Sequence, residues 1–87
     1  MKFESVRLND AWGNSCALTN LVFRGGRKDV MKITDAIEDS KDGDELCRML
    51  NDILFSNFHV NRETDDYIRL LSVDMLGNKD YLIIMKN

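Results

Sequence analysis

The sequence predicts an α+β domain in which two helices pack on one face of an antiparallel sheet of about four strands. Strand-like apolar patterns occur near both ends of the chain, and two amphipathic helical patterns lie between them without an intervening linker. The predicted element order is therefore ββ-αα-ββ. With 87 residues and a mass of 10.1 kDa, the chain is short enough for one compact domain spanning residues 1–87.

The first two predicted strands form a hairpin. Residues 2–9 place Val6 and Leu8 on one face and Phe3 one position out of phase, which indicates a strand with a bulge. Gly13 and Asn14 belong to the turn that follows, and residues 15–23 are rich in the apolar and β-branched side chains typical of a strand.

The first predicted helix begins after a glycine pair, with Asp29 at the N-cap position. Val30, Ile33 and Ile37 follow at a spacing that forms one apolar stripe. We expect this helix to end near Ser40.

The second predicted helix opens with Asp42 and Glu45 at the spacing of a capping box. Its amphipathic pattern extends over about four turns. The apolar stripe comprises Leu46, Leu50, Ile53, Leu54 and Phe58, with Cys47 beside it.

The C-terminal hairpin, residues 66–75 and 79–86, is the strongest local signal and follows a polar loop at residues 61–65. Gly77 and Asn78 fit the centre of a two-residue type II′ turn. In the register that this turn sets, Val73 lies opposite Leu82, and both face the helices.

The opposite face of this hairpin is too apolar for a sheet surface in water. Together with Trp12 of the first turn, it forms a predicted partner-binding surface whose residues are Ile68, Leu70, Tyr81, Ile83, Met85 and Trp12. A homodimer through this hairpin would use the same surface. The alternative is that part of the first hairpin or the C-terminal segment covers it.

A second predicted binding surface is acidic. Residues 35–52 hold seven acids against Lys41 and Arg48, a net charge of −5 in a chain whose total is −3. The acids are Asp35, Glu38, Asp39, Asp42, Asp44, Glu45 and Asp52. Carboxylates spaced about a helical turn apart can imitate nucleic-acid phosphates and occupy a basic groove on a larger protein. The alternative is an ordinary solvated helix face.

A third segment is basic and suits an anion. Adjacent glycines let a phosphate approach the backbone, and the start of a helix favours negative charge. The residues of this candidate phosphate or nucleic-acid site are Arg24, Gly25, Gly26, Arg27, Lys28 and Lys32. The spacing is not that of a P-loop, so solvated cations on a flexible connection remain the alternative.

The residue inventory argues against an enzyme. His59 is the single histidine, which excludes a histidine-rich metal site, and we expect it to cap the second helix or to pack at the edge of the core. The acidic stretch lacks the further ligands of a calcium loop. Cys16 and Cys47 lie in different elements, so we expect thiols and no disulfide. We therefore expect no catalytic residue, no metal and no cofactor.

The chain also lacks the features of a membrane or secreted protein. Residues 1–7 show no signal-peptide pattern, and the longest apolar run covers only residues 81–85. We expect a soluble, cytoplasmic protein without a membrane partner. The bias toward Asn and Asp and the lack of Gln favour a bacterial or phage source.

These observations favour a small non-enzymatic protein that binds and inhibits or regulates a larger macromolecule. In size and charge it is similar to the anti-defence inhibitors of phages, including anti-CRISPR proteins, although no motif assigns it to such a family. One alternative is a nucleic-acid-associated regulator that uses the basic segment at residues 24–32. Another is an immunity protein or antitoxin that uses the acidic surface.

Overall fold

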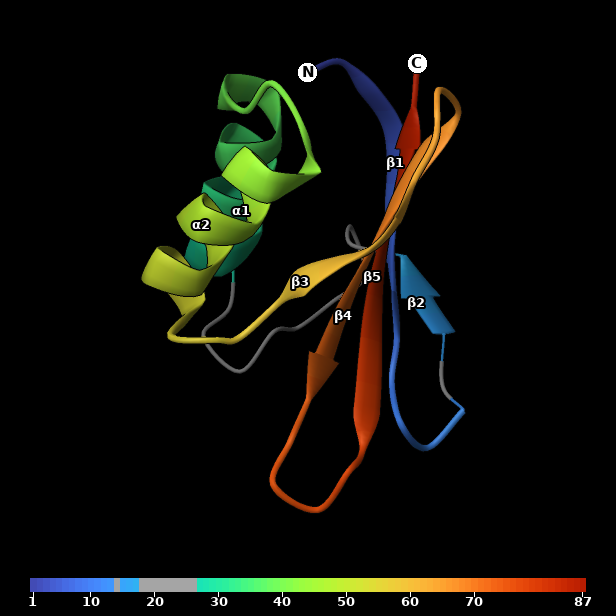
Figure 1. The fold of residues 1–87 in the computed structure, drawn as a ribbon. Helices are drawn as coiled ribbons and strands as arrows, with labels where there is room; N and C mark the ends of the chain where they lie inside the picture. Colours follow the sequence, from blue (N-terminus) through green and yellow to red (C-terminus); the bar gives the residue numbers. More distant parts are fainter. Residues whose placement is uncertain (14, 18–26) are drawn as a thin grey trace.

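The computed structural model describes residues 1–13, 15–17 and 27–87, and these form an antiparallel sheet covered on one face by two helices (Figure 1). The strand order is β2-β1-β5-β4-β3. The elements are β1 (Phe3–Asn9), β2 (Ser15–Ala17), α1 (Arg27–Asp39), α2 (Gly43–Leu54), β3 (His59–Glu63), β4 (Tyr67–Val73) and β5 (Lys79–Lys86). The predicted α+β class, with both helices on one face, is confirmed.

The N-terminal hairpin has the predicted form. β1 pairs antiparallel with β2 through Asn9 opposite Ser15, and its register against β5 shifts between Phe3 and Ser5. This shift is the expected bulge, and it lets Phe3 pack against the core from an out-of-phase position. The expected strand at residues 15–23 contains β2, and its remaining residues lie outside the described part of the chain.

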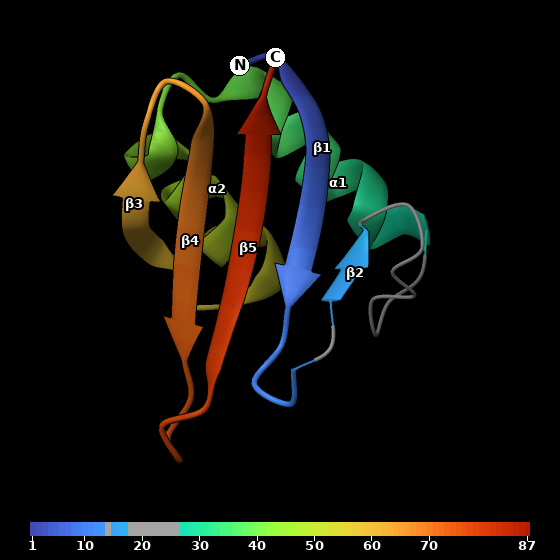
Figure 2. The same cartoon turned by 90° about the vertical axis from the view of Figure 1, so that its right-hand side faces the viewer.

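β3 is a strand where the sequence predicts mainly a loop. It begins at His59 and occupies one edge of the sheet (Figure 2). Only Val60 packs against the core, while the other side chains of the strand are exposed. An edge strand with a single inward apolar residue has no alternating hydrophobic pattern, and it was therefore missed.

The C-terminal hairpin exists, but the predicted register is wrong. Val73 lies opposite Lys79, not Leu82, because the turn contains the three residues 75–77. The N–H of Gly77 donates to the carbonyl oxygen of Asp74 at 3.1 Å, and Gly77 adopts a φ of 82°, which glycine tolerates best. The sequence thus forms a turn with a bulge residue in place of the two-residue turn.

The carboxylate of Asp74 holds this turn. Its Oδ1 accepts the backbone N–H groups of Leu76 at 2.8 Å and Asn78 at 2.9 Å. The hydrogen bond from the Asn78 backbone is the largest influence that lowers the pKa of Asp74 below its usual range. The charged carboxylate therefore favours the three-residue turn over the alternative.

A register shift of three residues exchanges the two faces of β4. Ile68 and Leu70, which the sequence places on the outward surface, are fully buried opposite Ile84 and Leu82. An odd shift moves every side chain of a strand to the other face. These two residues are thus core residues and not part of a binding surface.

The core lies between the inner face of the sheet and the helices. Its fully buried large side chains come from both layers: Ile33, Ile37, Leu46, Leu50, Ile68, Leu70, Leu82 and Ile84. The helical stripes supply the first four of these, as the sequence predicts. Burial of such aliphatic side chains contributes roughly 1.5–3 kcal/mol each, and it is the main force holding the two layers together.

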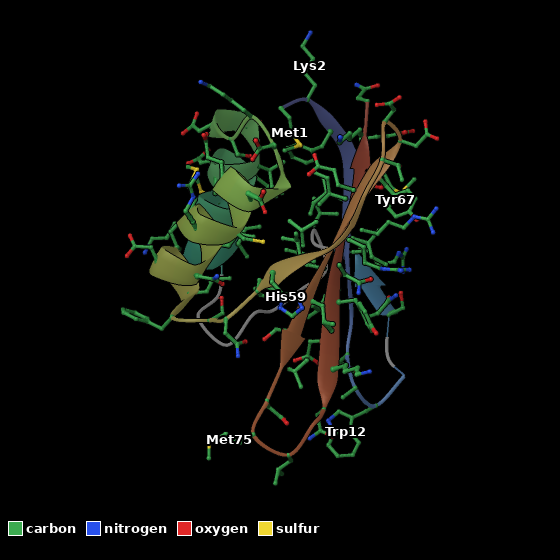
Figure 3. All side chains as sticks on the ribbon, in the orientation of Figure 1. Met1, Lys2, Trp12, His59, Tyr67 and Met75 are labelled. Carbon is green, nitrogen blue, oxygen red and sulfur yellow. The ribbon has the colours of Figure 1, made fainter. Side chains whose placement is uncertain are left out.

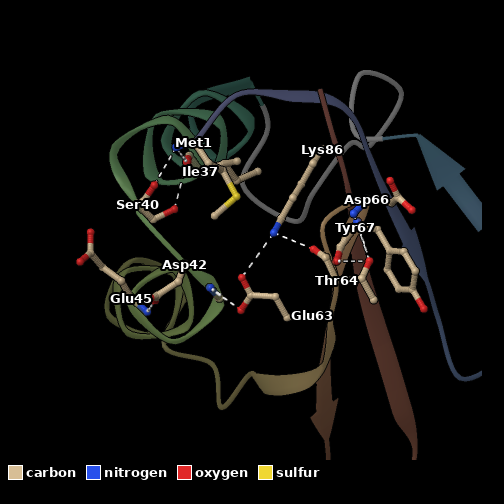
Figure 4. Close-up of polar contacts among 11 residues, drawn as sticks. Met1, Ile37, Ser40, Asp42, Glu45, Glu63, Thr64, Asp66, Tyr67 and Lys86 are labelled. Carbon is tan, nitrogen blue, oxygen red and sulfur yellow. Dashed lines mark hydrogen bonds and ion pairs between the residues drawn. The ribbon is translucent and has the colours of Figure 1, made fainter.

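Helix α1 differs from the prediction at its start and is capped at its end by the chain's own amino group. It begins at Arg27, so Asp29 lies inside its first turn and is not the N-cap. It ends at Asp39, as expected. There the Met1 amino group donates to the carbonyl oxygens of Ile37, Glu38 and Ser40 at 2.6–2.8 Å, where a cation is favoured (Figure 4).

Helix α2 has the predicted N-cap and an unexpected C-terminal contact. The Oδ1 atom of Asp42 accepts the backbone N–H of Glu45 at 2.8 Å. Asn51, in the last turn of α2, bonds to both backbone groups of Phe58, which follows the helix. Its side chain accepts the Phe58 N–H at 2.7 Å and donates to the Phe58 carbonyl oxygen at 2.8 Å. His59 is exposed in β3 and does not pack against the core, so the expectation that it caps the helix or packs at the edge of the core is wrong.

Gly43 and Glu63 join α2 to the sheet (Figure 4). The Gly43 N–H donates to Oε1 of Glu63 at 3.0 Å, while Lys86 in β5 lies 3.5 Å from Oε2 and donates to the carbonyl oxygen of Thr64 at 2.7 Å. A Cβ atom on residue 43 would lie 2.7 Å from Oε1 of Glu63 and 2.9 Å from Cγ2 of Val60. The Glu63 carboxylate could move aside, but the branched Val60 side chain is stiffer, so the close approach of helix and strand favours glycine here.

The register predicts effects of very different size for two neighbours on β4. Ile68→Ala should lower the free energy of unfolding by about 2–5 kcal/mol because it leaves a cavity in the core. Arg69→Ala should lower it by less than about 1 kcal/mol because Arg69 points away from the helices. Chemical denaturation measures both values, and a small effect at Ile68 would favour the two-residue turn register instead.

Candidate binding surface

The face of the sheet opposite the helices carries an unusual set of side chains. We define the outer face as the strand positions of β1, β3, β4 and β5 whose side chains alternate with the inward-facing ones. One of them, Leu71, is itself buried. Its residues are Ser5, Arg7, Asn9, His59, Arg62, Tyr67, Arg69, Leu71, Val73, Lys79, Tyr81, Ile83 and Met85. The outer face holds four basic residues and no acid, although the chain as a whole is acidic.

Three arginines lie in one row across this face. Arg7 is opposite Ile83, Ile83 is opposite Arg69, and Arg69 is opposite Arg62. None of the three forms an ion pair with any residue that the structure describes. The one hydrogen bond of Arg7 within the described residues goes to the hydroxyl oxygen of Ser15, at 3.0 Å. The row thus presents positive charge that no described carboxylate neutralises.

The pair Arg62 and Arg69 is unfavourable within the folded chain itself. Directly opposite positions bring Cβ atoms to about 4.5–5.5 Å, and like charges there destabilise a sheet. Arg69 is fixed at this position, since its Nε donates to Oδ1 of Asn61 at 2.7 Å and its guanidinium carbon lies 5.7 Å from the Tyr81 ring centroid. An arrangement of like charges that lowers stability, but is held in place by neighbouring side chains, is typical of a functional surface.

Flat and apolar side chains surround the arginine row. Tyr67, Tyr81 and Ile83 are half-buried, and Met85 is 39% exposed. Tyr67 projects from the sheet on the side away from the helices (Figure 3). The sequence correctly predicts that Tyr81, Ile83 and Met85 face outward. It misses Arg69, because only the correct β4 register places this residue beside Ile83 on the outer face. It misses Arg62, because β3 was predicted mainly as a loop.

Trp12 lies at one end of the molecule, beyond the outer face (Figure 3). It is 79% exposed in the β1–β2 turn, and Met75 and Leu76 are exposed in the β4–β5 turn at the same end. The Ala11 N–H donates to Oδ1 of Asp80 at 3.1 Å, which joins the first turn to β5. Trp12 is therefore accessible to solvent at this end of the molecule.

The predicted acidic residues lie on the helical layer, on the other side of the molecule from the outer face. Asp42 and Glu45 also serve the N-terminus of α2, the first through its carboxylate and the second through its backbone N–H. Glu45 is half-buried, and the remaining acids are exposed, namely Asp35, Glu38, Asp39, Asp42, Asp44 and Asp52. The two surfaces of opposite charge are thus separated by the core.

The structure describes the predicted basic segment only in part. Arg24, Gly25 and Gly26 lie outside the described residues. Arg27 and Lys28 begin α1, and Lys32 is exposed on the same helix. The segment therefore stays a sequence-based prediction.

The groups that could act as nucleophile or metal ligand are dispersed. Cys47 is a free thiol in the core, and burial, followed by Asp44 and Glu63, raises its pKa to about 11. A buried neutral thiol is unreactive. Within residues 1–13, 15–17 and 27–87, no three His, Cys, Asp or Glu side chains gather as a metal site. None of the described helices has the length and apolar character needed to cross a membrane.

Comparison with known proteins adds no family to this geometry. No protein-family model, curated protein or solved structure matches the chain. The candidate surface is therefore defined by its own residues alone.

The repulsion across β3 and β4 predicts a stabilising substitution. Arg62→Gln should raise the free energy of unfolding by about 0.2–1 kcal/mol because it removes one of two opposed like charges. Added salt should shrink the difference from the wild-type protein. The thermal midpoint, measured at low and high salt, checks both effects.

Arg48→Gln is the matched control for this measurement. Arg48 is spaced four residues from both Asp44 and Asp52 on α2. Arg48 forms no ion pair with a described carboxylate, so its loss removes only the longer-range attraction of the two acids and should lower stability by less than about 0.5 kcal/mol. Equal destabilisation by the two substitutions would contradict the repulsion between Arg62 and Arg69.

Proposed function

We propose that the protein is a non-enzymatic binding protein that regulates or sequesters an anionic macromolecule through its outer face. The observation that carries this proposal is the row of Arg7, Arg69 and Arg62, which has no described carboxylate partner. Arginine is favoured at such surfaces because its planar guanidinium is weakly hydrated and binds carboxylates and phosphates with two parallel hydrogen bonds.

The surroundings of the row also support binding rather than chemistry. Tyr81 and Ile83 separate the charged groups with apolar surface, which lowers the local dielectric constant and strengthens attraction to an anion. The thiol of Cys47 is buried and protonated at neutral pH, so it cannot serve as a nucleophile. His59 is exposed on an edge strand.

Retention on immobilised heparin, a polyanion, tests the proposal. Despite its net charge of −3, the wild-type protein should be retained at about 50 mM salt, where anion contacts are strong. A variant with Arg7→Gln, Arg62→Gln and Arg69→Gln should pass through the column. Failure of the wild-type protein to bind would contradict the proposal.

Two matched variants locate the effect. Lys2→Gln, Lys41→Gln and Arg48→Gln remove the same charge from exposed positions outside the outer face and the basic segment, and they should leave retention unchanged. Arg24→Gln, Arg27→Gln and Lys28→Gln test the basic segment in the same way. Loss of retention in this last variant alone would assign the function to residues 24–32 instead.

A second candidate function is the inhibition of a basic, nucleic-acid-binding protein by the acidic helical layer. The exposure of Glu38 and Asp39 on α1 and of Asp44 and Asp52 on α2 favours it, since these carboxylates are free to imitate phosphates. An anti-defence inhibitor or an immunity protein would act in this way.

Reversal of two acids that do not hold the fold tests the second candidate. The wild-type protein should capture nucleic-acid-binding proteins, and added DNA should displace them. The variant with Glu38→Lys and Asp39→Lys should no longer capture these proteins, because its carboxylates no longer imitate phosphates. Mass spectrometry of proteins captured from a cell lysate measures this. Lys32→Glu with Lys41→Glu is the opposite control and should retain them. If neither added DNA nor the two acid reversals changes which proteins are captured, this function is excluded.

A further inference from the structure

We propose that the partner of the outer face is a single-stranded nucleic acid, with its phosphates on the arginine row and its bases on the tyrosines. This inference rests on the proposed function and specifies its ligand. Arg7 and Arg69 are two strands apart, about 10 Å across the sheet. The two guanidinium groups can therefore bind different phosphates along one nucleic-acid backbone.

The aromatic residues supply the second half of the recognition. Tyr67 and Tyr81 lie on neighbouring strands four positions apart, a separation of about 14 Å along the sheet. Both are half-buried, so their rings are held while part of each stays open to solvent. Unpaired bases stack on such rings whatever their sequence, and arginine adds stacking on its own plane.

The shape of the face favours a single strand over a duplex. Both described helices lie on the other side of the sheet, so neither of them projects from the outer face to enter a groove (Figure 1). Bases inside a duplex cannot reach Tyr67 or Tyr81, because stacking needs an exposed base plane. A single strand exposes both its phosphates and its bases to the same surface.

Other occupants fit the same residues less well. Two copies of the chain packed face to face would oppose Arg7, Arg62 and Arg69 with one another, and like charges across an interface cost several kcal/mol. An acidic segment of a protein would pair the arginines but would offer the tyrosine rings no planar surface. Positive charge together with open aromatic rings complements a nucleic acid on both counts.

Fluorescence anisotropy of labelled oligonucleotides tests the inference. The probes are oligo(dT) and oligo(U) of about 12 nucleotides, within the usual site sizes of single-strand binders, and a duplex of equal length. At about 50 mM salt the protein should bind one or both single strands more tightly than the duplex. With three arginine contacts, affinity should fall with salt at a log–log slope of about −2.

Substitutions at Tyr67 separate stacking from simple charge attraction. Tyr67→Leu should weaken single-strand binding about tenfold, while Tyr67→Phe, which keeps the ring, should bind nearly as the wild type does. The outer-face variant with Arg7→Gln, Arg62→Gln and Arg69→Gln should bind the oligonucleotides much more weakly. Any residual affinity should depend less on salt, because the phosphate contacts are lost. Circular dichroism confirms that each variant is folded.

The outcomes distinguish this inference from the proposed function. Retention on heparin without preference for single strands, or equal binding by Tyr67→Leu and wild type, overturns the inference and leaves polyanion binding intact. Binding of neither heparin nor oligonucleotide overturns both. If the protein self-associates, Arg69→Gln alters this self-association, and no oligonucleotide binds, the outer face is assigned to a second copy of the chain. That result overturns the inference.

Discussion

The three-residue turn between β4 and β5 determines which side chains reach solvent on the outer face. Asp74 and Gly77 fix this turn, one through the hydrogen bonds that its carboxylate accepts and the other through a backbone conformation that glycine tolerates best. Because side chains alternate along a strand, that choice sends Ile68 and Leu70 into the core and Tyr67 and Arg69 outward. The core and the candidate surface are therefore consequences of the same local geometry.

The helical layer is tied to the sheet by polar contacts as well as by the core. At one point Glu63 in β3 contacts both Gly43 of α2 and Lys86 of β5, so that an edge strand, a helix start and a central strand share one carboxylate. At another, the Met1 amino group binds the last carbonyls of α1. These contacts hold the sheet against the helices from its inner side.

The sequence predicts the architecture better than the surface. The helical stripes of Ile33, Ile37, Leu46 and Leu50 and the N-cap at Asp42 are local signals, and the structure confirms them. β3 has one inward apolar residue and gives no such signal. The register of β4 depends on whether Gly77 is the bulge of a three-residue turn or the first residue of a two-residue turn. The sequence around Gly77 is compatible with both turns, so it does not distinguish the two registers. The arginine row depends on that register, and it is therefore a property of the pairing and not of any segment.

The separation of charge between the two layers has an electrical consequence. Carboxylates cover the helices, while Arg7, Arg62, Arg69 and Lys79 occupy the opposite side of the sheet, and the molecule measures only 32 × 26 × 23 Å. This separation of charge contributes a dipole component perpendicular to the sheet. In the field of a highly charged macromolecule a dipole rotates before contact, so encounters begin in the correct orientation, and the acidic side is turned away from a negative partner. A small net charge can therefore coexist with fast, orientation-selective association.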